Sequence, residues 1–462
     1  MTPPTATPPA TATEPAPTEP DSIRRLGPRP LPLHVMTAAW TCLTSFGGYP
    51  LLKQGLLPLK AELQDEAEAL RAELAKVAPA KFASALTEES CRLLDQLAAG
   101  VLAYRRHPYR RNLDTPPTVW REGTTRLLDY APENRDGLPV LLVPSLINRA
   151  YVLDLSENRS LARWLAAEGF RPLLVDWDRP GEVERSFTLT DYIGGRLEQA
   201  LDAALALTGR KPALLGYCMG GLLAVALAQR RQRDLQGMIL LATPWDFHAG
   251  ARFRFDRIMP MLAPGLAAAM EAWRELPTDV LQMLFYSLDP YLVIRKFRQF
   301  AAMDPASPKA QAFVALEDWL NDGIPLAGPV ARECLVGWYG ENQPERKRWR
   351  IAGRPVDPGQ IDLSTLILVP ARDRIVPPPS ATPLLTAIPG ALAMSPPLGH
   401  IGMVVAEAAP QRAWRPMAEF LGGLDRRDRP NPARWTQPRP AGMNHSMRGN
   451  AESRFRGKTK ET

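Results

Sequence analysis

Short apolar runs alternate with segments of helical periodicity along much of this chain. The expected strands are 138–143, 172–176, 212–215, 237–243, 363–370 and 391–395, and the expected helices lie near 160–168, 189–207, 222–231 and 404–421. Strands that are apolar along most of their length are typical of a parallel sheet whose two faces are both covered. The pattern therefore predicts an α/β fold, with a mostly parallel sheet and helices on both of its faces.

The alternation stops once, after Pro244, and resumes at Leu363. The residues between, 245–363, are helix-like and rich in Trp, Phe, Met and Arg. Because functional loops follow the carboxyl ends of parallel strands, an insertion at this point is expected to form a large helical cap over a site there. Caps of this kind exclude water and shape the channel through which substrate enters.

The two ends of the chain differ from this core in composition. Residues 1–30 contain nine prolines among Thr, Ala and Glu, which predicts disorder, whereas 31–106 are rich in Ala, Glu and Leu and are expected to be helical. The expected organisation is a disordered Pro-rich N-terminus at 1–30, a helical region at 31–106, the first part of the α/β core at 107–244, the helical cap at 245–363, the second part of the core at 364–424 and a disordered basic tail at 425–462.

An apolar patch lies within the N-terminal helical region, from Phe46 to Leu57. A patch of this kind suits contact with an apolar surface such as a lipid or a polymer, or packing against the domain's own core. We expect the second.

The net charge of +7 comes almost entirely from the tail, because residues 425–462 hold ten Lys and Arg against four Asp and Glu. The rest of the chain is nearly neutral, which argues against a nucleic-acid-binding domain. The tail is expected to be solvated, although its charge would also suit an anionic surface.

The four cysteines, Cys42, Cys91, Cys218 and Cys334, are widely spaced and form no C-x-x-C pair. This spacing argues against a zinc site and a disulfide framework, and it favours a reducing compartment. The N-terminus lacks the features of a secretory signal, and no uncharged apolar stretch is long enough to span a bilayer. We therefore expect a cytoplasmic protein without a metal or a membrane span.

The segment Gly216-Tyr217-Cys218-Met219-Gly220-Gly221 connects an apolar run to the small-residue helix at 222–231. This is the layout of the G-x-S-x-G nucleophile elbow, with Cys218 in place of serine. The helix N-terminus stabilises a thiolate and a developing oxyanion. The backbone N–H of Met219 is expected to form half of an oxyanion hole, with the other half at Leu146 in the loop after the first strand. The alternative is that Cys218 is a buried small hydrophobic residue.

Two later strands end in an acid and a base. Asp373 follows the strand at 363–370, and His400 follows the strand at 391–395. The order nucleophile, acid, histidine is that of the α/β-hydrolase fold. His400 is expected to accept the thiol proton of Cys218, and Asp373 to orient His400 and stabilise its imidazolium form.

Other residues compete for these roles less well. His248, at the start of the cap, is the rival to His400, while Asp357 and Asp362 precede a strand rather than follow it. Asp176 and Asp246 are expected to be structural or to support the site. A thiolate exchanges readily with thioesters, so Cys218 suits acyl transfer from a coenzyme A thioester better than hydrolysis of stable oxygen esters.

With these motifs the chain resembles the polyhydroxyalkanoate synthases, also called poly-beta-hydroxybutyrate polymerases, over roughly 110–420. The resemblance is carried by Gly216-Tyr217-Cys218-Met219-Gly220-Gly221, by 147–155 (Ile-Asn-Arg-Ala-Tyr-Val-Leu-Asp-Leu), by Val175-Asp176-Trp177, by Asp373-Arg374-Ile375-Val376-Pro377 and by Gly399-His400-Ile401-Gly402. Many members of the family have His where Arg374 stands here.

The resemblance implies that Cys218 carries the growing hydroxyacyl chain and that His400 activates Cys218. Asp373 would support His400 or help to activate the 3-hydroxyl of the substrate. The implied partners are a 3-hydroxyacyl-CoA, the polyester chain and the surface of the polymer granule. No cofactor is implied, since coenzyme A is the leaving group of the substrate. A homodimer and a small partner subunit are both left open.

The first functional hypothesis is therefore an acyltransferase that polymerises 3-hydroxyacyl-CoA in the cytoplasm, at the granule surface. The second is a hydrolase on the same scaffold, acting as an intracellular polyester depolymerase, an esterase or a thioesterase. The third is a catalytically idle granule-binding protein that uses the patch at 46–57 and the basic tail. The complete order Cys218, Asp373, His400 argues against the third.

Overall fold

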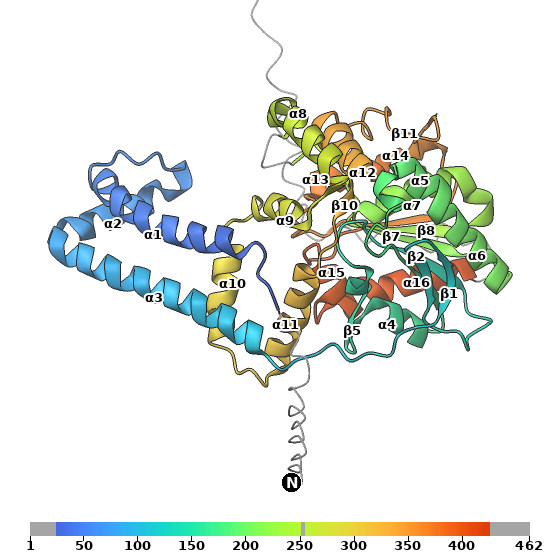
Figure 1. The fold of residues 1–462 in the computed structure, drawn as a ribbon, viewed down its shortest axis with the longest axis horizontal. Helices are drawn as coiled ribbons and strands as arrows, with labels where there is room; N and C mark the ends of the chain where they lie inside the picture. The colour runs from blue at the N-terminus through green and yellow to red at the C-terminus, as the bar shows by residue number, and fades with distance from the viewer. Residues whose placement is uncertain (1–24, 251–254, 426–462) are drawn as a thin grey trace, which may run out of the picture. The chain divides into compact units, whose positions relative to one another are not determined.

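The computed structural model describes residues 25–250 and 255–425 (Figure 1). The segments predicted to be disordered, 1–30 and 425–462, lie outside the described residues except at 25–30 and at 425. The prediction of disorder is wrong for 25–30. Arg25 is buried, pairs with Asp318, and donates hydrogen bonds to the backbone carbonyls of His107 and Tyr109. The Arg29 amide also donates to Asn321, and Arg105 donates to the carbonyls of Leu26 and Gly27, so hydrogen bonds to distant residues order this proline-rich segment.

An eight-stranded, mostly parallel sheet forms the core, as predicted. Its order is β1-β2-β6-β3-β7-β8-β13-β14; β1 and β2 are antiparallel to their neighbours and the remaining strands are parallel. The strands are β1 Thr118–Glu122, β2 Thr125–Asp129, β3 Pro139–Val143, β6 Arg171–Asp176, β7 Ala213–Tyr217, β8 Gly237–Leu241, β13 Thr365–Leu368 and β14 Leu392–Met394. Strands β3, β7 and β8 are buried throughout, which explains their uninterrupted apolar sequences.

Helices cover both faces of this sheet (Figure 1). The segment α5 Leu189–Asp191, η4 Tyr192–Leu197 and α6 Glu198–Thr208 lies on the same side as α7 Met219–Arg231, and α4 Leu161–Ala167 and α16 Arg415–Asp425 lie on the other. Helix α7 is the most central of them, because every residue from Met219 to Ala228 is buried. Its small side chains let it approach β7 and β8 closely.

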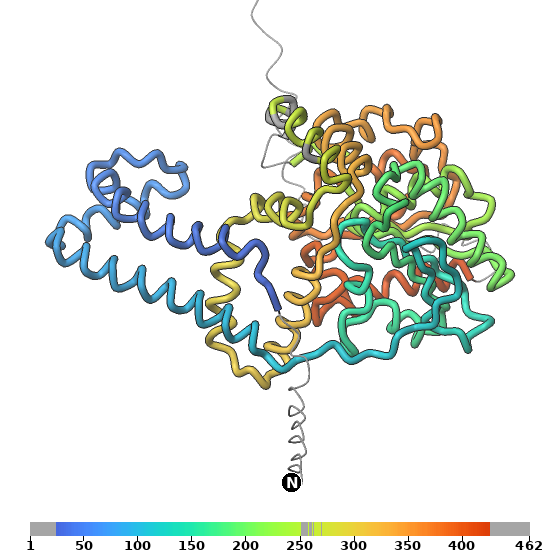
Figure 2. Tube along the Cα trace, viewed as in Figure 1, coloured from blue at the N-terminus to red at the C-terminus, as the bar shows by residue number. Residues whose placement is uncertain are grey.

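The chain divides into two compact units. Of the described residues, one unit contains 110–250, 255–290 and 322–425, including the sheet, and is named the catalytic unit. The other, the helical unit, contains residues 25–109 and 291–321. Residues 291–321 were predicted to belong to the cap at 245–363, but they cluster instead with the N-terminal helices. Figure 2 traces the path of the chain through these segments.

The described part of the helical unit is built from α1 Leu31–Lys53, η1 Ala61–Leu63, α2 Gln64–Ala75, α3 Pro79–Arg106, α10 Leu292–Ala301 and α11 Pro308–Asn321. Its core joins α3 to α10 and α11 through Val101, Tyr104, Phe297 and Val314. The ring of Tyr104 meets Phe297 edge-on, with 5.6 Å between the centroids, and the Tyr104 hydroxyl donates to Asp318. These contacts between distant segments explain why 291–321 separates from the rest of the predicted cap.

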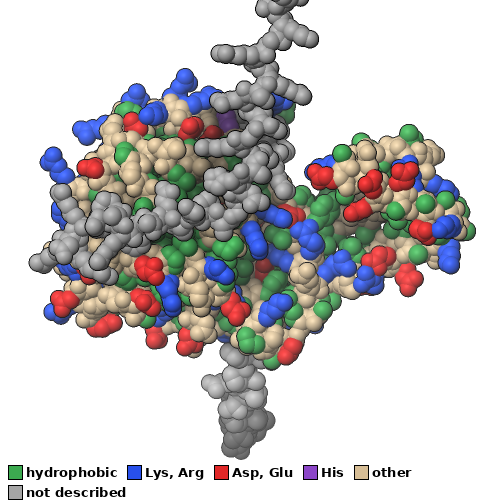
Figure 3. Space-filling view, turned by 180° about the vertical axis from the view of Figure 1, so that it is seen from behind, with side chains coloured by type: hydrophobic (Ala, Val, Ile, Leu, Met, Phe, Trp, Pro, Cys, Tyr) green, Lys and Arg blue, Asp and Glu red, His purple; other side chains and the backbone are tan. Residues whose placement is uncertain are grey.

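The patch at 46–57 packs on its own unit only in part. Tyr49 stacks on Phe82 at 4.0 Å between centroids, whereas Phe46, Leu51 and Leu56 are exposed. Earlier in α1 the side chains of Met36, Trp40 and Leu43 are also exposed, although the helix has no Asp, Glu, Lys or Arg before Lys53. Hydrophobic side chains lie between charged ones at the surface of these helices (Figure 3). Within the described residues, no helix combines the length and the hydrophobicity needed to cross a bilayer.

The approach of α10 to α3 gives a prediction about Gly100. A Cβ atom at this position would lie 2.0 Å from the carbonyl oxygen of Phe297, which is backbone and cannot move aside cheaply. Gly100→Ala is therefore expected to lower the free energy of unfolding by about 1–3 kcal/mol. The matched control is Gly47→Ala in α1, where a Cβ meets nothing within 4 Å and alanine should raise helix stability by about 1 kcal/mol. Urea unfolding followed by circular dichroism measures both, and equal stabilities for the two variants would contradict the packing described here.

Candidate active site

Cys218 lies in the sharp turn between β7 and α7 and has φ 56° and ψ −126°. A positive φ is unfavourable for a residue with a Cβ, by about 1–3 kcal/mol, and such residues are typical of functional sites. The turn is held by the Cys218 amide, which donates to the carbonyl oxygen of Leu241 in β8 at 2.8 Å. The elbow predicted from the sequence is present in the structure.

Three glycines leave the space that this turn needs. A Cβ at Gly216 would lie 2.6 Å from the Cα of Gly221. One at Gly220 would lie 2.1 Å from the carbonyl oxygen of Val143, and one at Gly221 would lie 1.8 Å from the hydroxyl of Thr243. The start of α7 therefore rests directly on the ends of β3 and β8, and any side chain at these positions would push it away.

Asp373 and His400 form a buried pair at the ends of the neighbouring strands. The Nδ1 atom of His400 lies 2.7 Å from Oδ2 of Asp373. The other carboxylate oxygen of Asp373 accepts the backbone N–H groups of Ile375 and Val376, both at 2.8 Å. With both oxygens engaged, the carboxylate has one orientation and presents Oδ2 to the imidazole.

The loops that carry these two residues are hydrogen-bonded to each other. The amide of Ala371 donates to the carbonyl oxygen of Pro396 at 2.9 Å, and that of Arg372 donates to Leu398 at 3.0 Å. The pairing of β13 with β14 thus continues past the ends of both strands. Since Asp373 and Gly399 follow directly, the continued pairing brings the acid and the histidine together.

The electrostatics of His400 link it to Cys218 as well as to Asp373. Burial lowers the pKa of the imidazole, but the charge of Cys218, the hydrogen bonds that the imidazole makes with the Asp373 and Cys218 side chains, and the charge of Asp373 together raise this pKa to about 10. The pKa of His400 therefore depends on Cys218 as well as on its hydrogen-bonded partner Asp373. These surroundings favour a protonated His400.

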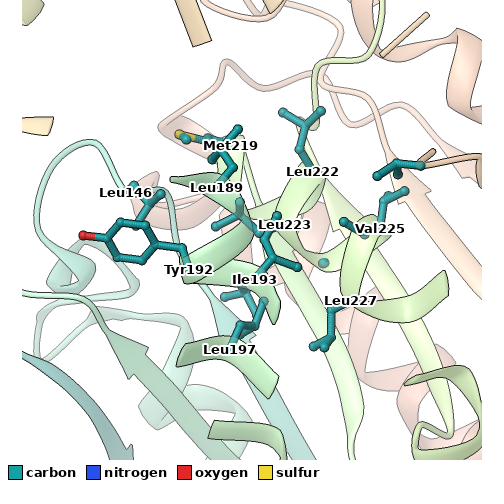
Figure 4. Close-up of a cluster of buried hydrophobic side chains, with 14 of the residues drawn as sticks. Leu146, Leu189, Tyr192, Ile193, Leu197, Met219, Leu222, Leu223, Val225 and Leu227 are labelled. Atoms are coloured by element: carbon teal, nitrogen blue, oxygen red, sulfur yellow. The ribbon is translucent and has the colours of Figure 1, made fainter. Parts of the chain in front are cut away.

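The two predicted oxyanion-hole residues are anchored in one hydrophobic cluster. Leu146 and Met219 are both buried, and their side chains pack in the cluster that contains Leu189 and Tyr192 (Figure 4). Met219 is the first residue of α7, so its N–H belongs to the first turn of the helix, whose amides have no acceptor within the helix. The close contact of Gly220 with the Val143 end of β3 holds the loop of Leu146 near this amide.

Trp177, to which the sequence assigned no role in the site, contacts the loop before Leu146. Its indole N–H donates to the carbonyl oxygen of Pro144 at 3.1 Å and so holds this loop. The family motif contains Trp177, but nothing in the local sequence indicates this contact.

The rival residues have other partners. The Nε2 atom of His248 lies 3.1 Å from the carbonyl oxygen of Tyr339. Asp357 accepts the amide of Gly359, at the start of a short helix, and the amide of Asp362 donates to Gln232.

The two other carboxylates support structure, as expected. Asp176 pairs with Arg126, and Asp246 accepts the side chain of Asn342 and the amides of His248 and Ala249.

Arg374, where many of the resembling family have histidine, is mostly exposed and pairs with Asp289 at 3.3 Å. Among residues 25–250 and 255–425, no group of three or more His, Cys, Asp or Glu is arranged to hold a metal ion.

Family models match two parts of this chain. The model described as "alpha/beta hydrolase fold" matches residues 139–406, more than half of the chain, and includes Cys218, Asp373 and His400. The model described as "Poly-beta-hydroxybutyrate polymerase (PhaC) N-terminus" matches residues 111–165.

Several relatives align with about two thirds of this chain. The poly(3-hydroxyalkanoate) polymerase subunit PhaC of Haloferax mediterranei is 29% identical over 313 residues, which cover 66% of this chain and 63% of that protein. The subunit of the same name from Haloarcula marismortui is 28% identical, over 65% of this chain and 66% of its own length. The one from Allochromatium vinosum is 28% identical, over 63% of this chain and 82% of its own. The match thus spans less than two thirds of the first two relatives, and it confirms the resemblance found in the motifs.

The raised pKa of His400 predicts how stability depends on pH. The folded state holds the proton with a pKa of about 10 against an ordinary value of 6.5. The stabilisation of the folded state by the proton on His400 is therefore complete below about pH 6.5, and it is lost as the pH rises toward 10. The difference in unfolding free energy between the unmodified protein and His400→Gln should shrink over this range.

Urea unfolding from pH 6 to 10 measures this difference. Cys218→Ala serves as the control, because it removes the charge that raises the His400 pKa most. It should therefore narrow the pH range over which this difference changes. A difference that is constant across the whole range would contradict the assignment of a protonated His400.

Proposed function

Because this chain belongs to the α/β-hydrolase fold family, we propose that it is an acyltransferase which polymerises 3-hydroxyacyl groups from their coenzyme A thioesters. The observation that carries this proposal is a cysteine at the nucleophile elbow whose side chain faces a buried His400–Asp373 pair. A cytoplasmic location, where such thioesters are made, is part of the proposal.

In the first step, the Cys218 thiolate attacks the thioester carbonyl carbon of the substrate. The oxyanion that forms is stabilised by the N–H groups of Met219 and Leu146, each worth about 3–4 kcal/mol of barrier. Collapse of this intermediate breaks the bond to the sulfur of coenzyme A, which leaves as a thiol after taking the proton from His400. The acyl group is then held as a thioester on Cys218.

In the second step, a hydroxyl group attacks this acyl-enzyme. His400 accepts the hydroxyl proton while Asp373 stabilises the resulting imidazolium, and an oxygen ester forms as the bond to Cys218 breaks. Cys218 leaves as a thiolate and His400 keeps the proton, which restores the starting state. When the hydroxyl belongs to another 3-hydroxyacyl group, the product is a chain longer by one unit.

Polymerisation is favoured over hydrolysis by two findings. Proteins named poly(3-hydroxyalkanoate) polymerase or its subunit PhaC align with this chain on both sides of the elbow, and the segment at 111–165 matches the N-terminus of such polymerases. A thiol nucleophile also exchanges acyl groups between sulfur atoms of similar basicity. The free energy of the thioester is therefore kept for the next transfer.

Purified protein supplied with 3-hydroxybutyryl-CoA tests this function. We expect release of free coenzyme A together with insoluble polymer, and a loss of about a thousandfold or more in turnover for Cys218→Ala. Cys91→Ala, at an exposed cysteine of the helical unit, is the matched control and should retain full turnover. Free 3-hydroxybutyrate without polymer would instead indicate a hydrolase, and full turnover by Cys218→Ala would rule out both activities.

We further propose that the chain associates with the surface of its polymer product through α1. This helix has no charged residue before Lys53 and exposes Met36, Trp40 and Leu43. An amphiphilic surface of this kind gains free energy when it contacts an apolar polyester, at about 25 cal/mol per Å² of apolar area removed from water.

Sedimentation with amorphous poly(3-hydroxybutyrate) particles measures this association. Trp40→Glu is expected to weaken binding about tenfold or more, because it places a charge in the apolar contact. Ala85→Glu adds the same charge at an exposed position of α3 and should bind like the unmodified protein. Equal binding by all three proteins would exclude α1 as the contact surface.

A further inference from the structure

Tyr217 is the residue directly before Cys218 in β7, and its side chain reaches the loop of His400. The phenol hydroxyl donates to the backbone carbonyl oxygen of His400 at 3.3 Å, in a buried setting. The Tyr217 ring also lies against the imidazole, with 5.3 Å between the ring centroids and 36° between the planes. One side chain therefore contacts both the ring and the backbone of the proposed base.

The loop that carries His400 needs such a contact. Gly399 and Gly402 lie on either side of the histidine, and there is room for a Cβ atom at both positions. A Cβ at Gly399 would be 3.6 Å from its nearest neighbour and one at Gly402 would be 3.8 Å away, both ordinary contacts. Glycines at such positions leave the backbone freer than other residues would. Asp373 holds only Nδ1 of the ring. The backbone hydrogen bonds beside the histidine, from Arg372 to Leu398 and from Met403 to Gly399, hold its neighbours rather than the carbonyl of His400 itself.

We propose that Tyr217 is a positioning residue, which fixes the distance and orientation of His400 relative to Cys218. Cys218 is the next residue along the chain, so movement of the β7 end would carry Tyr217 and the nucleophile together. The hydrogen bond from Tyr217 holds the backbone carbonyl of His400, and the contact between the rings limits rotation of the imidazole. The hydrogen bond to Asp373 holds Nδ1. Nucleophile and base are thereby tied together through one side chain, although they are 182 positions apart in the chain.

The Tyr217 hydroxyl remains protonated and can therefore donate this hydrogen bond. Burial, followed by the charges of Cys218 and Asp373, raises the pKa of Tyr217 well above its ordinary value. The phenol is therefore neutral throughout the range in which a thiolate can react, and it remains a hydrogen-bond donor. An unpaired carbonyl would be left at His400 if the hydroxyl were removed.

The test uses the reactivity of the Cys218 thiol, which requires no substrate. Iodoacetamide alkylation of Cys218 is followed by peptide mass spectrometry, so that Cys42, Cys91 and Cys334 are counted separately. Tyr217→Phe keeps the ring and removes the hydroxyl. We expect its alkylation rate at neutral pH to fall about three- to tenfold, the effect of one buried hydrogen bond. The acid limb of its pH profile should also move to higher pH, because a looser imidazolium stabilises the thiolate less.

Two further variants separate positioning from a merely structural role. Replacing Tyr217 with 4-aminophenylalanine keeps the ring and restores an N–H donor, and it should return the rate to within about twofold of the unmodified protein. Tyr130→Phe removes a different hydroxyl of the catalytic unit, which donates to Asp154 at 3.2 Å. It should leave the alkylation rate and the pH profile unchanged. An unchanged profile in Tyr217→Phe, an equal change in Tyr130→Phe, or no recovery with 4-aminophenylalanine would each overturn the proposal.

The turnover measurement rests on the proposed function and is kept separate for that reason. With 3-hydroxybutyryl-CoA, Tyr217→Phe should lower kcat for coenzyme A release by the same three- to tenfold factor, with KM unchanged within about twofold. If the protein releases no coenzyme A, the polymerase assignment fails while the alkylation result still decides the role of Tyr217. If kcat is unaffected although coenzyme A is released, the positioning role is overturned.

Discussion

The tight turn at Cys218 is the constraint on which the rest of the catalytic unit depends. A residue with a Cβ is held there at positive φ, and the turn remains because it joins β7 to α7 and is hydrogen-bonded to Leu241 of β8. Gly216, Gly220 and Gly221 contribute by having no side chain, since a Cβ on any of them would overlap backbone or Thr243. The close approach of α7 to the sheet then places the amide of Met219 beside the loop of Leu146. The strained backbone at Cys218 and the position of the predicted oxyanion-hole residues are therefore two results of one packing arrangement.

The second requirement is electrostatic. A buried imidazole would ordinarily lose its proton, because burial penalises the charged form. Here Cys218 and Asp373 lie on its two sides, and their combined effect outweighs burial and raises the pKa of His400 to about 10. Asp373 can act in this way because two backbone amides hold its second oxygen. The orientation of His400 is thus fixed before reaction by Asp373 and the two amides that hold it, which reduces the reorganisation needed when charge develops.

Much of the catalytic unit was predictable because its signals are local. Strands β3, β7 and β8 are continuous apolar runs, because burial on both faces of a strand disfavours polar side chains on either face. The elbow is a run of six residues, and each of its glycines is needed because a Cβ there would overlap a neighbouring residue. The acid and the histidine were found through the chain order that α/β-hydrolase folds share, since each had to follow a strand in a parallel sheet. The prediction of disorder failed at 25–30, where the partners of Arg25 are about 80 and 290 residues away.

The sequence by itself therefore determined the order of the strands along the chain. It also predicted Cys218 as the nucleophile and the pairing of Asp373 with His400, and the structure contains that pair. Only the tertiary structure decided that 291–321 join the N-terminal helices, that Trp177 holds the loop before Leu146, and that Tyr217 reaches His400. The physical reason is the range of the interactions. Periodicity, turn chemistry and the glycines of the elbow act within a few residues, and they leave a trace in the local sequence. A tyrosine hydroxyl that meets a carbonyl more than 180 positions away leaves none, because any buried tyrosine in a strand has the same local pattern.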